Sequence, residues 1–345
     1  MRKNAMYFPY ISVPNNSWSI RTLLYWDKLS SIVPVEYIEA PEKLGCFMRN
    51  LVREGLVEQV FPAHYLGELP GFEECFKKLI SYGGYKDFNV FGAFDGSSSL
   101  DSRVLMHLEK AGELSEFLVE KNVAELAGCG WLSVDRKVAD FYMAYLVSCL
   151  GSIERIDAAP VTNQGRYMRM FDWVGGENPR KTNVVHHNKA RDVVLNSLFP
   201  VPDGMIRLDD LLKFKNDYGH LLCSLRGEVE KECSVIAMMP NAIDRVDAVR
   251  TFCIKAAGQI EEVEVAMRSF WRRVAFVDLF PIIGAGFTAY ASQNSDDLAY
   301  AGACFTVAAC VNQVVTNAAS KKHISSYSAP LAYVAHFNSS FRRSK

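Results

Sequence analysis

The fold is indicated first by residues 6–38, which read MYFPYISVPNNSWSIRTLLYWDKLSSIVPVEYI. The apolar and aromatic run 6–13 predicts a strand. Pro9 has no backbone N–H, so it predicts either an edge strand or the end of a strand. Asn and Ser side chains at 15–17 can cap a following helix, and residues 32–38 predict a second strand. A strand, a helix and a strand in succession indicate an α/β arrangement.

The alternation of strands and helices continues through the first half of the chain. Apolar residues at spacings of three and four predict helices, whereas short apolar runs ended by Gly or Pro predict strands. The expected strands are 6–13, 32–38, 56–61, 103–108 and 193–199. The expected helices are the one capped at 15–17, then 44–52, 72–80, 114–126 and 138–149, the last capped by Asp135. The order of the strands does not follow from this pattern.

The second half of the chain takes a helical period from Leu208 onward. After Pro240, apolar residues alternate at steps of three and four, which predicts one long helix that packs along its length. The seam consists of Val246, Val249, Cys253, Ala256, Ile260, Val263, Met267, Phe270, Val274 and Val277. An internal bundle is favoured over a free coiled-coil dimer because several seam residues are small. We therefore expect an α+β or α/β domain with a small sheet over 1–205 and a helical domain over 206–345.

Two apolar segments rich in small residues, 274–292 and 298–319, continue the helical half. A short polar link joins them, so we expect a helical hairpin in which small residues let the helices approach closely. Both segments are near the ~20 residues that span a bilayer, so membrane contact is an alternative. Asp278 and Asn312 interrupt the segments, and a charged side chain at bilayer depth costs roughly 2.5–3.5 kcal/mol. Packing within a soluble helical domain is therefore favoured.

Composition narrows the class of protein. A chain of 345 residues with a formal net charge of −1 lacks the basic balance of a general nucleic-acid-binding protein. Its nine cysteines form no Cys-x-x-Cys pair and no Cys/His cluster, which predicts reduced thiols in a cytoplasmic protein. The N-terminus has no apolar run of signal-peptide length. Nucleotide-binding, hydrolase and metalloprotease motifs are absent, so neither a cofactor nor a resident metal is expected.

Asp101, Glu109 and Lys110 are the first of two weak groups of catalytic candidates. They flank the strand expected over 103–108 and faintly resemble a metal-dependent nuclease core. That core needs its second acid and its lysine two positions apart, on one face of the strand. Glu109 and Lys110 are adjacent and would point to opposite faces. A structural or surface role is therefore favoured.

His186 and His187 are the second group, in the densest polar cluster of the chain, 186–191. Histidine can act as a base or a metal ligand. Adjacent side chains on an extended chain diverge, however, so this pair is a poor metal site. A loop that contacts phosphate or a partner remains an alternative to a solvated loop, which is favoured.

Three short motifs mark the N-terminal region. They are Tyr7-Phe8-Pro9-Tyr10-Ile11, Leu23-Leu24-Tyr25-Trp26-Asp27 and Ile32-Val33-Pro34. Together with 134–151, 208–226 and the small-residue hairpin, they resemble a family of bacterial proteins that has no assigned catalytic residue. The resemblance implies a bacterial or phage-derived intracellular protein and transfers no site. Families of this kind often act as accessory or antiviral-defence components.

Three functional hypotheses follow, and they leave open whether the protein is an enzyme. The favoured one is a non-enzymatic interaction or accessory component, which binds a protein partner or a second copy of itself through the helical half. The second is an enzyme that acts on nucleic acid or nucleotides through the N-terminal half, although the net charge does not support nucleic acid. The third is a membrane-perturbing effector that acts through 274–319.

Overall fold

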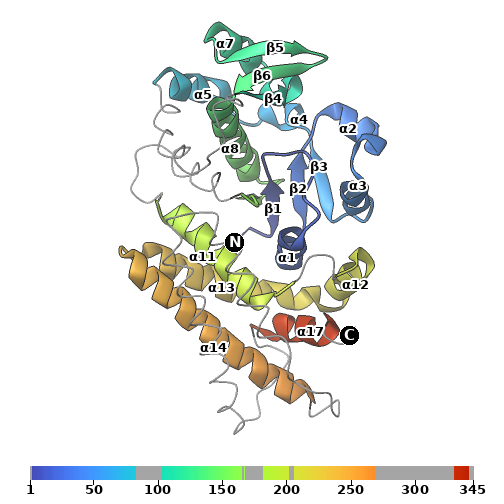
Figure 1. Cartoon of the computed structure of the whole chain (residues 1–345), viewed down its shortest axis with the longest axis vertical. Helices are drawn as coiled ribbons and strands as arrows, with labels where there is room; N and C mark the ends of the chain where they lie inside the picture. The colour runs from blue at the N-terminus through green and yellow to red at the C-terminus, as the bar shows by residue number, and fades with distance from the viewer. Residues whose placement is uncertain are drawn as a thin grey trace. The chain divides into compact units, whose positions relative to one another are not determined.

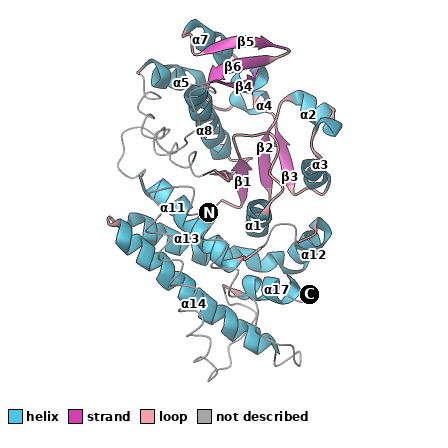
Figure 2. Ribbon diagram, viewed as in Figure 1, coloured by secondary structure: helices cyan, strands magenta, loops and turns pink. Residues whose placement is uncertain are grey.

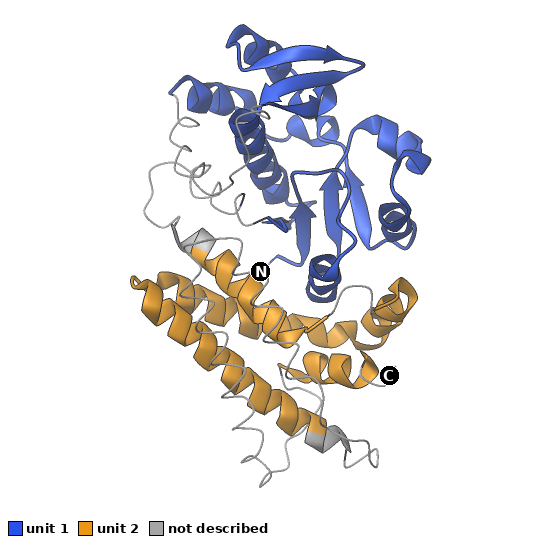
Figure 3. Cartoon of the chain, in the orientation of Figure 1, with its two compact units in different colours: residues 1–181 blue, residues 182–345 orange. Residues whose placement is uncertain are grey.

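The computed structural model divides the chain into two compact units, residues 1–181 and 182–345, which Figure 3 shows in two colours. Unit 1 combines sheets with helices, and unit 2 is helical in all the parts described. The predicted fold class, a small sheet with helices followed by a helical half, is confirmed. The structure describes residues 2–82, 103–164, 167, 182–201, 206–268 and 330–341.

A four-stranded parallel sheet is the centre of unit 1. Its strands are β1 (Asn4–Tyr7), β2 (Leu29–Ile32), β3 (Val57–Val60) and β7 (Ala158–Val161), in the order β3-β2-β1-β7. Every neighbouring pair is parallel, and Figure 2 shows β1, β2 and β3 side by side. All four residues of β2 are buried, as is usual for an inner strand of a parallel sheet.

The first two predicted strands are shorter than expected. The run 6–13 forms a strand only as far as Tyr7, and β1 lies between β2 and β7. Pro9 therefore marks a strand end and not an edge. The predicted strand 32–38 is wrong beyond Ile32, where β2 ends, because Pro34 is the N-cap of helix α2 (Val35–Glu39). Proline has no N–H for the ladder, and its fixed φ suits a helix start.

Four other helices of unit 1, at 17–25, 46–53, 72–81 and 136–152, lie close to where the sequence predicts them. Helix α8 begins after Asp135, whose side chain caps the N–H groups of Lys137 and Val138 as predicted. It packs on β1 and β7, and a Cβ at Gly151 would overlap the carbonyl oxygen of Ala158. The helices are α1 (Ser17–Tyr25), η1 (Pro41–Lys43), α3 (Cys46–Arg53), α4 (Ala63–Leu66), α5 (Phe72–Ser81), α6 (Leu108–Ala111), α7 (Leu114–Glu120) and α8 (Arg136–Ser152), labelled in Figure 1 where there is room.

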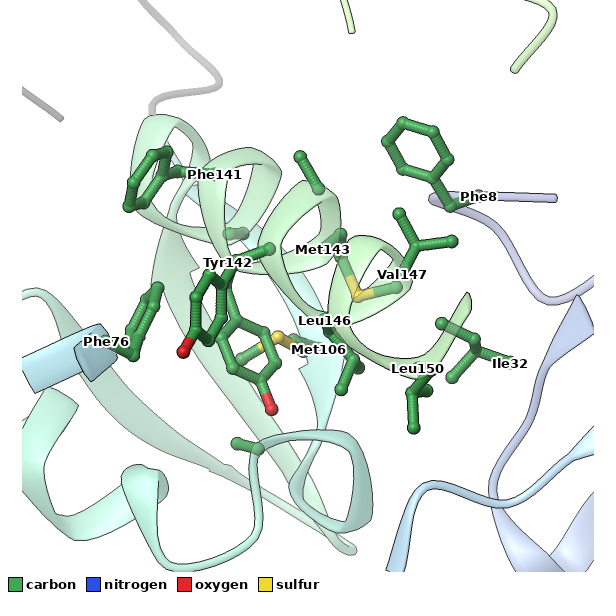
Figure 4. Close-up of a cluster of buried hydrophobic side chains, with 14 of the residues drawn as sticks. Phe8, Ile32, Phe76, Met106, Phe141, Tyr142, Met143, Leu146, Val147 and Leu150 are labelled. Carbon is green, nitrogen blue, oxygen red and sulfur yellow. The ribbon is translucent and has the colours of Figure 1, made fainter. Parts of the chain in front are cut away.

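The apolar core of unit 1 gathers along α8. Figure 4 shows Phe76 of α5 beside Phe141 and Tyr142, with Ile32 and Phe8 nearer the other end of the helix. The rings of Phe76 and Phe141 are stacked 5.9 Å apart, and Tyr142 meets Phe76 edge-on at 5.0 Å. Such ring pairs stabilise by about 0.5–1.5 kcal/mol beyond the apolar area they bury. The core therefore ties α8 to the strand ends that carry the polar residues described below.

A second, antiparallel sheet replaces part of a predicted helix. Its strands are β4 (Arg103–His107), β5 (Ala124–Gly128) and β6 (Trp131–Asp135), in the order β4-β6-β5. The helix expected over 114–126 ends at Glu120 as α7, so its last part is wrong. Residues 128, 129 and 130 all have positive φ, at 82°, 49° and 81°. Such angles reverse the chain between two strands and cannot continue a right-handed helix.

Unit 2 is a helical bundle, and its boundary differs from the one we predicted. The strand expected over 193–199 is wrong, because residues as far as Leu198 belong to α11, which packs against α13 and α14. The boundary between the units in the sequence therefore lies at 181/182 instead of 205/206. The elements are α11 (Thr182–Leu198), α12 (Leu208–Tyr218), η3 (Gly219–Leu221), α13 (Leu222–Met238), α14 (Ala242–Arg268) and α17 (Ala332–Phe341).

The part of the heptad seam from Val246 to Val263 lies on α14 and is buried inside unit 2. Its side chains from Val246 to Val263 are all buried, and α14 packs against α11, α13 and α17. The internal bundle is therefore what this part of the seam forms. The seam beyond residue 268 and both apolar segments, 274–292 and 298–319, lie outside the described residues. Among the helices that are described, none is both long and apolar enough to cross a membrane.

Candidate functional site

The order of the parallel strands points to the carboxyl edge of the sheet. From β1 the chain moves to β2 and then β3 on one side, whereas β7 returns to the other side of β1. The strand order therefore reverses its direction at β1, between β2 and β7. In open α/β sheets a crevice forms outside the carboxyl ends of the strands at such a reversal, and ligands bind there. The ends of β1 and β7 are thus the first place to look for a site.

Polar and aromatic side chains gather at this reversal. The O–H of Tyr7 donates to Oδ1 of Asn163 (3.2 Å), which joins the ends of β1 and β7. Nε2 of Gln164 donates to the hydroxyl oxygen of Tyr10 (3.2 Å), which joins the loops beyond them. The ring of Trp18, in the first turn of α1, lies 5.6 Å from that of Tyr7. We call these five residues the switch-point cluster.

Burial fixes the part that Tyr7 plays. Its side chain is buried at the end of β1, and desolvation, with a smaller effect from Tyr10, raises the pKa of its phenol well above the usual range. The hydroxyl therefore stays protonated and can donate to Asn163. Because Oδ1 of Asn163 accepts this bond, the Nδ2 amide group is turned away from Tyr7. Thr162 is also buried, and its hydroxyl oxygen accepts from the backbone N–H of Gln164 (3.2 Å).

The loop from β1 to α1 is held by short local bonds. The hydroxyl of Ser31, on β2, donates to the carbonyl oxygen of Ile11 (2.5 Å). Oδ1 of Asn16 accepts from the N–H of Ser19 (3.2 Å) and caps α1, as the Asn residues at 15–17 predicted. These bonds fix the start of α1, and with it the place of Trp18. The switch-point cluster is thus supported from three strands and one helix.

A second group of polar side chains lies where β2 leads into α2. Oε2 of Glu109 accepts from the N–H of Val35 (2.7 Å), so α6 is joined to the carboxyl end of β2. The N–H of Glu109 donates to Nδ1 of His107 (3.3 Å), and Nε2 of His107 lies 3.9 Å from Oε1 of Glu36. Glu36 is also paired with Lys43 (2.7 Å). Glu109 therefore acts here as a structural link between the two sheets of unit 1.

The ring of His107 is closely confined. Trp131 meets it edge-on at 5.0 Å, and a Cβ on Gly130 would lie 3.3 Å from its Nε2. Gly130 also has a φ of +81°, so this position suits glycine for two reasons. The carboxylates of Glu36 and Glu109 each lie 3.9 Å from a ring nitrogen of His107.

Lys110 is the most unusual titratable residue of unit 1. It is only 5% exposed, and burial lowers the pKa of its ammonium to about 8. None of the ion pairs formed within the described residues includes it. Glu109 and Lys110 are not arranged as a nuclease pair, because Glu109 binds a backbone N–H and Lys110 is buried. Asp101 lies outside the described residues.

His186 and His187 lie on α11 of unit 2 and not in a loop. His187 contacts Oε2 of Glu230 (3.2 Å), and its Nδ1 faces the guanidinium of Arg191 (3.1 Å). Burial, with Arg191 as the next cause, lowers the pKa of His187. Burial, followed by Arg245, likewise lowers the pKa of His186. Both rings are therefore neutral near pH 7, and His187 belongs to a packed network between α11 and α13.

The described residues contain no candidate metal-binding site. Across those ranges, no three His, Cys, Asp or Glu side chains converge as they would around a metal ion. The switch-point cluster was not predicted from the sequence, because none of the expected strands covers 158–161. The detectable signal was the pair Asn163 and Gln164 directly after the short apolar run 158–161. Polar residues at the end of a strand would have marked the site.

Comparison with protein-family models, curated proteins and solved structures found no match to this chain.

Proposed function

We propose that unit 1 is a binding domain for a small polar molecule, with its site at the switch-point cluster. The observation that carries this proposal is the strand order β3-β2-β1-β7, with polar side chains on both strands that flank the reversal. Fold alone does not establish a function, since the same sheet serves many activities. The support comes from the coincidence of the reversal with Tyr7, Asn163 and Gln164.

This proposal develops the second sequence-based hypothesis, a nucleotide-directed role for the N-terminal half, and it concerns binding. Lys110 and His107 are titratable groups elsewhere in unit 1, and Glu109 joins α6, the helix of Lys110, to the carboxyl end of β2. A buried amine with a lowered pKa is a common feature of catalytic sites. A chemical step would require the bound molecule to reach these groups. The binding proposal stands without such a step.

A thermal-shift screen of the full chain against small polar metabolites tests the proposal. A ligand present at about 100 times its Kd stabilises the folded state by about 2.7 kcal/mol, which is readily detected. We expect Asn163→Ala to weaken binding about tenfold, so the stabilisation at the same ligand concentration should fall to about 1.4 kcal/mol. Asn50→Ala on α3 is the matched control, because the side chain of Asn50 makes only a long contact with the Cys46 sulfur (3.8 Å) among the described residues. A shift that is unchanged in Asn163→Ala would place the ligand elsewhere and contradict the proposal.

A second function, protein interaction through unit 2, has one observation in its favour. Apolar side chains are exposed where α13 leads to α14, with Met238 66% and Ile243 65% exposed and Val235 beside them. Exposed apolar side chains grouped in this way often mark contact surfaces. This surface now motivates the hypothesis, because the described part of the seam is buried within unit 2. We propose that Met238 and Ile243 lie in the contact.

Light scattering after size exclusion tests this second function. If the contact joins two copies, Met238→Glu should convert an oligomer to a monomer. Val119→Glu, at an exposed apolar position on α7, is the control and should leave the mass unchanged. A wild-type chain that is monomeric at all concentrations would rule out self-association through this surface.

We also propose a cytoplasmic location. The support is that the seven cysteines described by the structure are all free thiols, and that burial raises the pKa of Cys253 to about 11. Buried, unreactive thiols suit a reducing compartment. Treatment of the native protein with a thiol reagent should label Cys46 and Cys75, which are exposed, before Cys233 and Cys253.

A further inference from the structure

The switch-point cluster leaves a defined set of hydrogen-bonding groups for a ligand. Because Oδ1 of Asn163 is taken by Tyr7, its Nδ2 amide remains as a donor. Nε2 of Gln164 is used on Tyr10, so the Oε1 carbonyl remains as an acceptor. The hydroxyl of Tyr10 accepts that bond and keeps its own hydrogen as a donor. A donor and an acceptor on neighbouring residues, with a second donor beside them, form an alternating pattern.

The described stretches that carry this pattern contain no charged side chain. Neither the loop 8–16 nor the segment 161–164 contains a Lys, Arg, Asp or Glu. The start of α1, where a phosphate would bind in many α/β proteins, is capped by the chain itself. Asn16 accepts from the N–H of Ser19, and the hydroxyl of Ser19 donates to the carbonyl oxygen of Pro14. These features argue against recognition of a phosphate at this position.

Aromatic side chains accompany the amides. Tyr10 is 46% exposed, and Trp18 is half-buried with its ring against Tyr7. Exposed aromatic faces stack on flat rings, and Asn and Gln amides pair with the edges of nucleobases. A flat heterocycle with alternating acceptors and donors on its edge would satisfy both features. A sugar would offer only hydroxyl groups, and a phosphate would need positive charge.

We propose that the switch-point cluster recognises an uncharged nitrogen heterocycle of the nucleobase class. In this arrangement Asn163 and Tyr10 donate to the ring edge and Gln164 accepts from it, while an aromatic face covers the ring. The inference rests on the proposed binding function of unit 1 and names its ligand class. The sugar and any phosphate of a nucleotide would extend away from the cluster.

Isothermal titration calorimetry of the full chain tests this inference. The probes are adenosine, guanosine, cytidine and uridine, with their 5′-monophosphates, ribose and orthophosphate as comparisons. At least one nucleoside should bind, its monophosphate should bind no more tightly, and ribose and orthophosphate should give no heat. Asn163→Ala and Gln164→Ala should each weaken nucleoside binding about tenfold, the upper end of what one lost neutral hydrogen bond causes.

Further variants keep the test decisive if an alanine substitution harms folding. Gln164→Glu has the same shape, keeps an acceptor and adds a charge, so it should weaken binding of every nucleoside. Asn50→Ala should change nothing. Binding that is unaffected by substitutions at 163 and 164, or that requires the phosphate, would overturn the inference. If none of the four nucleosides gives a heat of binding, the inference is overturned as well.

The proposed function and this inference can fail separately. Nucleosides can fail to bind while another metabolite gives a thermal shift that depends on Asn163. In that case unit 1 is a binding domain and the heterocycle assignment is wrong. If no metabolite gives such a shift, both fail.

Discussion

A buried lysine of unit 1 and a buried arginine of unit 2 are held in opposite ways. Arg191 of unit 2 is 8% exposed and forms two parallel hydrogen bonds with Glu230, from Nε (2.6 Å) and from Nη2 (2.8 Å). Its Nη1 donates to Oδ1 of Asn188 (2.9 Å). Lys110 of unit 1 is 5% exposed, and no ion pair within the described residues includes it. One cation is fully paired and the other is not.

The difference shows that the charge of Arg191 is structural, whereas the burial of the Lys110 charge is energetically unfavourable. A buried ion pair with complete hydrogen bonding is stable as a unit, and it joins α11 to α13. A buried ammonium without a carboxylate loses its hydration with little return, which is why the pKa of Lys110 falls to about 8. Proteins keep such groups mainly where they serve a function. Burial by itself therefore does not distinguish the two roles, whereas the partners do.

Breaking the pair in unit 2 should have the largest effect. Arg191→Met leaves the carboxylate of Glu230 without its main partner, and loss of one member of a buried pair costs about 3–5 kcal/mol. Urea unfolding followed by circular dichroism measures the loss. The double variant Arg191→Met with Glu230→Leu should recover most of it. If the single variant is as stable as the wild type, Arg191 is not the structural cation we describe.

The corresponding change in unit 1 should have the opposite sign. The pKa of Lys110 is lowered from 10.5 to about 8, so the unfolded chain takes up the proton first as the pH falls, and stability is lost between about 10.5 and 8. Lys110→Met removes this penalty and should raise the free energy of unfolding at pH 7 by up to about 3 kcal/mol. The same unfolding measurement would show a loss of stability if an unrecognised partner holds the ammonium.

Two glycines in the β5–β6 turn test how closely His107, three residues before Lys110, is confined. Gly130→Ala and Gly128→Ala share the cost of a positive φ, about 1–2 kcal/mol for a residue with a side chain. Only at Gly130 would the new methyl group press on the His107 ring, at 3.3 Å, because Gly128 faces open space. Gly130→Ala should therefore be the more destabilising. His107→Ala should remove the difference, and an equal cost at both positions would show that the ring moves freely.

The smallest expected effect is a pH dependence of unit 2. Desolvation is the main cause that lowers the pKa values of His186, His187 and His336 below 6.5. The unfolded chain therefore binds protons before the folded unit does, and stability is present above about pH 6.5 and is lost as the pH falls below it. Thermal unfolding between pH 7.5 and pH 5, with pH 6.5 near the start of the decline, measures this. His187→Gln should flatten the curve, and an unchanged slope would contradict the assignment.

Local patterns predicted α8 and α14 well but missed α11, which is as long as α8. Helix α8 was expected from its capping Asp135 and its apolar face, and α14 from a seam that repeats over many turns. These signals lie within a few residues of one another and depend on the backbone alone. Short elements were predicted poorly. Strand β7 has four residues, too few to show a period, and Val193 and Val194 resemble a strand although α11 holds them in a helix by packing.

The sequence by itself determined the two-part organisation, the main helices and the low charge, because periodicity, capping and composition are local or additive properties. Only the tertiary structure decided where the candidate site lies. Tyr7 and Asn163 are 156 residues apart, and they meet because β7 pairs with β1 and not with β3. The tertiary structure also showed that Lys110 and Arg191 differ in role. Both are basic residues near predicted strands, and only packing shows which one has a carboxylate partner. Strand order and charge pairing are long-range contacts, and no local pattern specifies them.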